Sequence, residues 1–350
     1  MLARRPVAAA AAAALVSFAP LASAQSSVTL YGVLDTFVGY IENNSPTAGK
    51  ASAGVVNTGG LQTSFFGIRG SEDLGGGLRA IFAIESFFQP DVGDSGRFRT
   101  DTFWARSAFV GLESGSFGRI TLGRNTAPYF ISTLLFNPLV DSFVVGPMIT
   151  HTFRGALQGD TGLSNSVRWT SPSWGGLRAD VLYSLGAEDL TGGPDKNAGK
   201  AIDAALVFFR GAFGATVAYR QIDLSAGGNG REQEAWQLGA SYDLKFLKAF
   251  AQYQQIKETF ALAASNIDRD TIQAGVSVPV GAGSILASYT TSDIKDVSPA
   301  TPSKRDTWAL AYVHTLSKRT DLYGAYYSDV FKSPDGAEQT VVALGVRHRF

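Results

Sequence analysis

The feature that most constrains this chain is an alternation of apolar and polar side chains that recurs along most of its length. In residues 236–243, WQLGASYD, the side chains of Trp, Leu, Ala and Tyr alternate with those of Gln, Gly, Ser and Asp. Residues 271–278, TIQAGVSV, separate in the same way. Successive side chains of a strand point to opposite faces, so this period predicts β-strands with one apolar and one polar face. The same alternation runs through residues 178–184, 216–220, 308–314, 321–329 and 340–350.

Charged side chains decide which face of these strands is wet. Residues 64–88 read SFFGIRGSEDLGGGLRAIFAIESFF, two apolar runs joined by a glycine-rich turn, and Arg69, Arg79 and Glu85 fall on one face of the hairpin. An arginine that faces lipid at mid-depth costs about 2–4 kcal/mol. A register slip of one residue would expose the whole set together. We therefore expect the ionic face to meet water and the opposite face to meet lipid.

The connections between strands alternate between short turns and long Gly-, Asn- and Ser-rich loops, and they separate sixteen strand segments. A sheet in lipid must close on itself, because unpaired backbone groups at its edges are costly there. A barrel of sixteen strands leaves an aqueous channel, which the polar inward face would line. The prediction is an all-β fold: one transmembrane antiparallel β-barrel of sixteen strands, comprising residues 25–350.

The first 24 residues are set apart from this fold. They contain Arg4 and Arg5, then an alanine-rich apolar run, and end in Ala-Ser-Ala, a small-x-small cleavage site. This is the pattern of a secretory signal peptide, so residues 1–24 are predicted to be removed from the mature chain. The run is too short for a spanning helix and is interrupted by Pro6 and Pro20.

Aromatic residues recur where the outward faces of the strands finish. We expect them at the same end of many strands, where rings with a polar tip suit the bilayer interface. The alternative is that aromatic residues simply favour strands. The residues concerned are Tyr183, Tyr219, Tyr242, Tyr253, Tyr289, Tyr312 and Phe350.

Composition argues against several other functions. The 30 basic residues are balanced by 30 acidic ones, which gives no field for binding nucleic acid. The chain has no cysteine and three scattered histidines, and no hydrolase, zinc-protease or P-loop motif is present. We expect no enzyme activity, no cofactor and no metal. A soluble secreted β-sandwich that acts as a binding module remains the alternative of a different class.

Several segments resemble the general porins of Gram-negative bacteria, nearest to the β-proteobacterial type. They are SSVTLYGVLD, SFFGIRGSEDLGGGLRAIF, RSAFVGLESGSFGRITLGR, NSVRWTSPSWGGL, LSKRTDLYGAY and the terminal LGVRHRF. The resemblance implies a homotrimer in the outer membrane, in contact with lipid and lipopolysaccharide, through which small hydrophilic solutes and ions diffuse passively. It also implies that Phe350 is the end recognised by the outer-membrane assembly machinery.

In such porins the third long loop folds inward and forms a constriction opposite arginines of the barrel wall. The resemblance assigns residues 125–164 to this loop and Arg106 to the wall, with Arg168 as a second and Arg124 as a third wall position. Arg69 and Glu85 share the lumen face. Each arginine could instead be an ordinary hydrated side chain of the lumen.

The chain departs from the family pattern at two points. Phe65 stands where the family usually has arginine, and the loop is unusually apolar, with Asp141 and Asp160 as its only acids. Asp141 is the preferred acidic partner of the wall. The departures leave open a substrate-selective channel in which Phe65 and residues 144–148 form an apolar slide through a partly apolar constriction.

Overall fold

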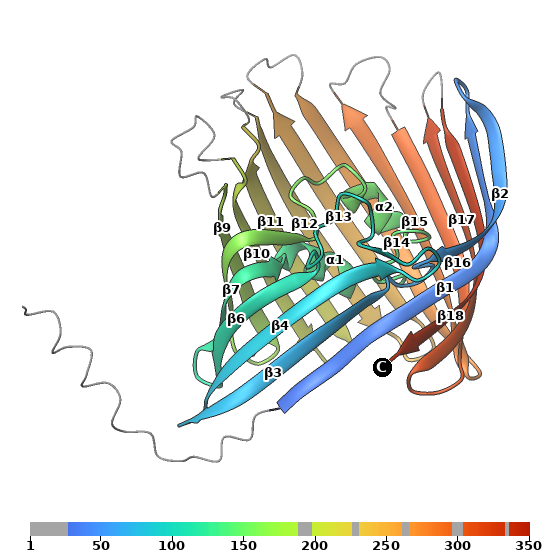
Figure 1. Cartoon of the computed structure of the whole chain (residues 1–350). Helices are drawn as coiled ribbons and strands as arrows, with labels where there is room; N and C mark the ends of the chain where they lie inside the picture. The colour runs from blue at the N-terminus through green and yellow to red at the C-terminus, as the bar shows by residue number, and fades with distance from the viewer. Residues whose placement is uncertain (1–26, 188–197, 226–230, 261–265, 296–303, 333–335) are drawn as a thin grey trace, which may run out of the picture.

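The computed structural model describes residues 27–187, 198–225, 231–260, 266–295, 304–332 and 336–350 (Figure 1). The predicted signal peptide lies outside these residues, as do parts of the long loops. Two short helices occur within the described residues, and no helix there is long and apolar enough to cross a membrane.

One sheet contains all the strands of the described residues, and every pair of neighbouring strands in it is antiparallel. The elements are β1 (Ser27–Ser45), β2 (Gly49–Thr58), β3 (Phe65–Gly75), β4 (Leu78–Gln89), β5 (Asp94–Ser95), β6 (Ser107–Ser114), β7 (Gly118–Thr126), α1 (Pro128–Leu135), α2 (Pro147–Phe153), β8 (Gly162–Thr170), β9 (Leu177–Leu185), β10 (Lys200–Arg210), β11 (Phe213–Asp223), β12 (Glu232–Asp243), β13 (Lys248–Thr259), β14 (Ile267–Val280), β15 (Gly283–Lys295), β16 (Lys304–Thr315), β17 (Thr320–Lys332) and β18 (Glu338–Arg349).

The sheet closes because β1 pairs with β18 as well as with β2 and β3. The first half of β1 pairs with β3 and its second half with β2, so β2 and β3 share one position in the ring. β5 is a two-residue extension on β4. The remaining strands each take one position, which confirms the predicted antiparallel barrel of sixteen strands.

Connections of different length lie at the two ends of the barrel, as expected. Two residues join β10 to β11 and β14 to β15, whereas residues 127–161 join β7 to β8. We call this long connection the L3 segment. It contains α1 and α2, and Figure 1 shows both helices among the strands of the barrel. Its ends lie slightly inside the predicted range of 125–164, because β7 and β8 extend further than the sequence pattern indicates.

Burial follows the predicted alternation, with polar side chains inside and apolar ones outside. Along β12, Gln237 is 0% exposed and Ser241 4%, whereas Trp236 is 47% and Leu238 55% exposed. Gln252 and Gln273 on the following strands are also buried. A soluble sandwich buries its apolar faces, so this reversed distribution argues against that alternative and provides the apolar band that lipid would cover.

The aromatic residues are spread along the outward faces toward both ends of the barrel, so the prediction that they gather at one end is wrong. Tyr219 packs on Trp236 with ring centroids 4.5 Å apart, toward the long-loop end. Phe350 closes the turn end, where its backbone pairs with Gly32. A bilayer has two interfaces, and an outward strand face meets both of them. Tyr183 and Tyr219 lie toward the loops, Tyr253 and Tyr289 near the middle of their strands, and Tyr242, Tyr312 and Phe350 toward the turns.

Leu238→Arg tests the outward orientation, since Leu238 lies between Trp236 and Tyr242 on the lipid-facing side of β12. We expect the variant to lose about 2–4 kcal/mol of unfolding free energy in phospholipid vesicles, measured by urea titration. Ser277→Arg on the lumen face of β14 is the matched control, with a loss below about 1 kcal/mol. Equal losses in the two variants would contradict the assignment of the faces.

Candidate functional site

The first helix of the L3 segment is fixed to the barrel wall by a buried ion pair. Asp203 on β10 accepts a hydrogen bond from the backbone N–H of Tyr129 at 2.7 Å and pairs with Arg220 on β11 at 2.5 Å. Both side chains of this pair are fully buried. α1 begins at Pro128 without a side-chain cap of its own, so the Asp203 carboxylate takes the place of one at the helix N-terminus. Arg220 also donates to the carbonyl oxygens of Gln158 and Asp160.

The second helix is held by side chains of β15 and β16, farther along the same series of strands. His151 lies between the hydroxyls of Ser292 and Thr307, with nitrogen–oxygen distances of 2.5 and 2.7 Å. Burial, with the nearby positive charge of Arg305 and Arg269, lowers the pKa of His151 well below its usual value. A neutral imidazole donates through one ring nitrogen and accepts through the other, which matches two hydroxyl partners.

Inward-facing glutamines bind residues in and after α1 and also one residue of α2. Gln252 donates to the carbonyl oxygens of Thr133 and Phe136 at 3.2 and 2.8 Å, and the Thr133 hydroxyl donates to Gln237 at 2.8 Å. The Thr152 hydroxyl donates to Gln254 at 2.6 Å. The polar alternation that makes these strands amphipathic therefore also supplies the partners that satisfy the loop backbone.

The apolar character of the L3 segment is largely explained by packing between the loop and the wall. Phe136, Leu139, Val145, Met148 and Ile149 are each 0–1% exposed. The expectation of an apolar slide over residues 144–148 thus fails for Val145 and Met148, which are buried.

Across the lumen, Arg106 and Glu85 form the centre of a polar wall. Arg106, just before β6, pairs with Glu85 on β4 at 2.8 Å, and the Tyr31 hydroxyl donates to the other oxygen of Glu85 at 2.6 Å. The Arg106 guanidinium lies 3.9 Å from the centroid of the Phe65 ring. Phe65 is itself buried against Phe87 and neighbouring residues. At this position the aromatic ring therefore supports an arginine and does not leave the wall uncharged.

A cavity of about 560 Å³ lies against this wall, and four of the predicted site residues line it: Arg69, Glu85, Arg106 and Arg168. Arg69 stacks over Tyr31 at 4.7 Å, and Arg168 forms a two-point pair with Asp180. α1 contributes Phe130, Ile131 and Leu134 to the other side of the cavity. Its charged lining residues are Arg69, Arg79, Arg106, Arg119, Arg168, Glu85 and Glu113.

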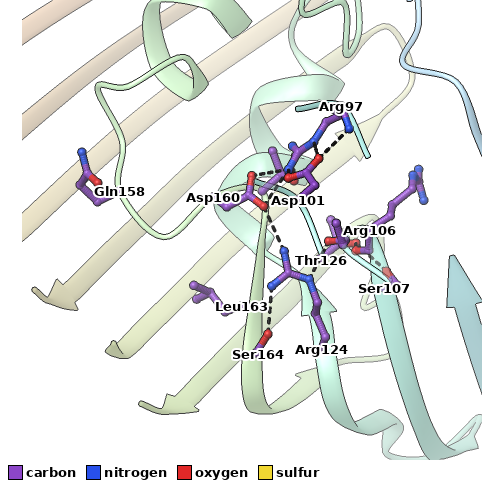
Figure 2. A network of polar contacts seen from close by, with 12 residues as sticks. Arg97, Asp101, Arg106, Ser107, Arg124, Thr126, Gln158, Asp160, Leu163 and Ser164 are labelled. Carbon is purple, nitrogen blue, oxygen red and sulfur yellow. Dashed lines mark hydrogen bonds and ion pairs between the residues drawn. The ribbon is translucent and has the colours of Figure 1, made fainter. Parts of the chain in front are cut away.

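Arg124 and Asp160 lie apart from that cavity and fasten the end of the L3 segment (Figure 2). Arg124 donates to the Ala105 carbonyl oxygen at 2.6 Å and pairs with Asp160 at 3.0 Å. Asp160 also pairs with Arg97 at 2.8 Å, and Arg97 in turn binds Asp101. The two arginines hold the pKa of the half-buried Asp160 carboxyl below its usual value, although partial desolvation alone would raise it. Arg124 therefore positions the end of the loop. We call this group of Arg97, Asp101, Arg124 and Asp160 the Asp160 clamp.

Asp141, near the tip of the L3 segment, is 5% exposed, and its Oδ1 has no hydrogen-bond partner among the described residues. Burial raises the pKa of this carboxyl to about 6, partly offset by the positive charge of Arg106. The Thr63 hydroxyl fixes the Asp141 backbone carbonyl at 3.3 Å. Asp141 thus interacts with Arg106 through space, while the direct ion partner of Arg106 is Glu85.

Tyr31, Arg119 and Arg97 contribute to the site but were not predicted from the sequence. Tyr31 and Arg119 lie on inward strand faces, and the strand alternation at these positions could have identified them. Arg97 lies in the irregular connection between β5 and β6, where no period fixes its direction. Within the described residues, no group of His, Cys, Asp and Glu could hold a metal ion.

Comparison with known proteins gives a consistent family. The sequence profile described as "Gram-negative porin" matches residues 9–333. Outer membrane porin protein 32 of Delftia acidovorans is 32% identical, over 97% of this chain and 98% of the relative. An outer membrane porin protein of Bordetella pertussis is 30% identical, with the same shares covered.

The solved structures agree with the sequence relatives. The structure titled "Anion-selective porin from Comamonas acidovorans" superposes with a TM-score of 0.80 at 30% identity and covers 93% of this chain and 100% of its own. These relatives confirm the predicted resemblance to β-proteobacterial porins. The chain belongs to the Gram-negative porin family, as an outer-membrane barrel through which small solutes diffuse passively.

Proposed function

We propose that solutes pass between the L3 segment and the wall that contains Arg106, and that the channel prefers anions. The observation on which this rests is the charge of the lining: five arginines and two glutamates face the 560 Å³ cavity. Two of the arginines are balanced by those glutamates, and Arg168 is balanced by Asp180. Arg69 and Arg119 form no ion pair with a described carboxylate, so the wall retains a positive excess.

A fixed positive charge in a narrow, partly apolar passage attracts anions and repels cations, because screening over the short distances there is incomplete. The relative from Comamonas acidovorans, whose title describes it as anion-selective, supports the same preference for this chain. Asp141 is the acid of the L3 segment that acts on Arg106, and its low exposure limits how far it offsets the wall.

A substrate-selective channel with a partly apolar constriction is the second candidate. The specific observation in its favour is that Phe130, Ile131 and Leu134 face the same cavity as the arginines. One wall is then charged and the other apolar. Ring stacking of Arg106 on Phe65 favours the first candidate, since the ring strengthens the position of a charge by about 0.5–2 kcal/mol.

The remaining assignments follow from membership of the family. We infer a homotrimer in contact with lipopolysaccharide, inserted by the assembly machinery through Phe350, and export by the signal peptide of residues 1–24. We also infer a channel without enzyme activity. His151 supports this, because both of its ring nitrogens are occupied in holding α2, and it lies deep in the packing between loop and wall.

Arg106→Ala tests the charged passage. Purified protein in planar bilayers should give stepwise conductance, and the variant should shift the reversal potential in a salt gradient toward cations. One unit charge at 8 Å is worth about 0.5 kcal/mol in water, which changes ion occupancy about twofold. Glu85→Gln should shift the potential in the opposite direction, and Arg99→Ala, at an exposed loop position, should leave it unchanged. Silent bilayers would contradict the channel, and an unchanged potential in Arg106→Ala would remove Arg106 from the passage.

Asp141→Asn tests the environment of the loop acid through the pH dependence of stability. A raised pKa means that the native state favours the protonated form, so this stabilisation is complete below pH 4 and is lost as the pH rises through about 6. The variant should match the wild type at pH 4 and exceed its unfolding free energy by up to about 3 kcal/mol at pH 7.5. Urea titration in phospholipid vesicles at both pH values measures this. Asp94→Asn, at an exposed acid, is the control, and a variant less stable at pH 7.5 would refute the assignment.

A further inference from the structure

A second cavity, of about 190 Å³, lies on the long-loop side of the barrel, between the wall of β1, β2 and β18 and the L3 segment. It differs in character from the arginine-lined cavity. Its apolar lining residues are Ile41, Phe88, Phe98, Phe143, Val144 and Val341. Two arginines, Arg97 and Arg154, and several amide side chains complete it. It is an apolar recess with cations at its border, inside an otherwise polar vestibule.

The aromatic part of this recess is held in place before any solute arrives. The rings of Phe98 and Phe143 meet edge to face with centroids 6.1 Å apart. The Arg97 guanidinium lies 5.6 and 5.3 Å from these two rings and is fixed by Asp101 and Asp160 (Figure 2). Arg97 is therefore neutralised by two carboxylates, and its role is to position the rings. A preorganised ring pair reduces the ordering cost of binding a third ring.

Arg154 provides the charge available to a ligand. It follows α2 directly, is exposed, and its hydrogen bond goes to the carbonyl oxygen of Phe143 at 3.4 Å. Within the described residues it forms no ion pair, in contrast to Arg97. A guanidinium with donors to spare, next to two aromatic rings, matches a planar carboxylate attached to an apolar group.

We propose that this recess binds aromatic monocarboxylates at the mouth of the channel, with the ring against Phe98 and Phe143 and the carboxylate on Arg154. The size is consistent: an apolar cavity of about 150 Å³ accepts benzene, so 190 Å³ accommodates one ring with a small substituent. The proposal deepens the proposed function and rests on it. A site of this kind would raise the local concentration of such anions immediately above the arginine wall.

Benzoate is the probe for this site, applied to the wild-type protein in planar bilayers carrying chloride current. We expect benzoate to reduce the current in a saturable manner, whereas acetate, which has the charge without the ring, and benzamide, which has the ring without the charge, should act only at much higher concentration. Arg154→Gln and Phe98→Ala should each raise the half-blocking concentration of benzoate by about tenfold. Arg99→Gln, next to Phe98 but outside the recess, is the matched control and should block as the wild type does.

The outcomes separate this site from the channel itself. Equal block by benzoate and acetate, or unchanged benzoate block in both Arg154→Gln and Phe98→Ala, would overturn the site while leaving the channel intact. Absence of conductance in the wild type would instead overturn the proposed function. Block is measured as the ratio of currents with and without benzoate in one membrane, so a change in basal conductance in a variant does not affect the comparison.

Discussion

The structure depends on one requirement: each strand must form backbone hydrogen bonds with a neighbouring strand on both of its sides. In lipid an open edge would leave a row of backbone groups without partners, and the β1–β18 pairing removes that edge. Once the ring is closed, each side chain faces either lipid or lumen. The position of the residue in the alternation along its strand determines which of the two it faces. The reversed burial of Gln237 and Leu238 shows the consequence on one strand. The apolar surface is covered by the membrane, and the polar surface is left inside a ring too wide to fill itself.

The lumen-facing side chains fill part of that space by binding the L3 segment. β10, β12 and β13 supply Asp203 and the inward glutamines, and the nearby β15 and β16 supply the hydroxyls around His151. These contacts are buried, and most of the polar groups in them have their hydrogen-bonding capacity satisfied there. The segment is therefore held on one side of the lumen. The arginines of β3, β4, β7 and β8, together with Arg106 just before β6, take no part in this anchoring. That asymmetry is what makes a passage with one charged and one apolar side possible.

Strand period and charge were enough to predict the barrel, its sixteen strands and the common face of Arg69, Arg79 and Glu85. The family resemblance placed Arg124 on the wall, at the root of the loop, but the register of β7 against β8 shifts between Gly123 and Asn125. A bulge adds one residue to a strand and changes the face to which the following side chains point. The two-residue alternation on one side of a bulge therefore does not predict orientations on the other side. Arg124 consequently belongs to the Asp160 clamp.

The apolar L3 sequence was also ambiguous, because an apolar residue in a loop can face a lumen or pack against a wall. Only the tertiary arrangement shows that Met148 and Val145 pack while Ile131 and Leu134 face the cavity. Arg97 lies outside any periodic pattern, and its ring contacts with Phe87 and Phe143 join residues distant in sequence.

The absence of cysteine from the chain makes a direct test of the central alternation possible. Ser277→Cys and Leu286→Cys place single thiols on the lumen side of β14 and β15, and Val276→Cys and Ile285→Cys place them on the lipid side. With the protein in phospholipid vesicles, a charged, membrane-impermeant thiol reagent should label the first two and spare the other two. Labelling of Val276→Cys and Ile285→Cys with protection of Ser277→Cys and Leu286→Cys would contradict the account.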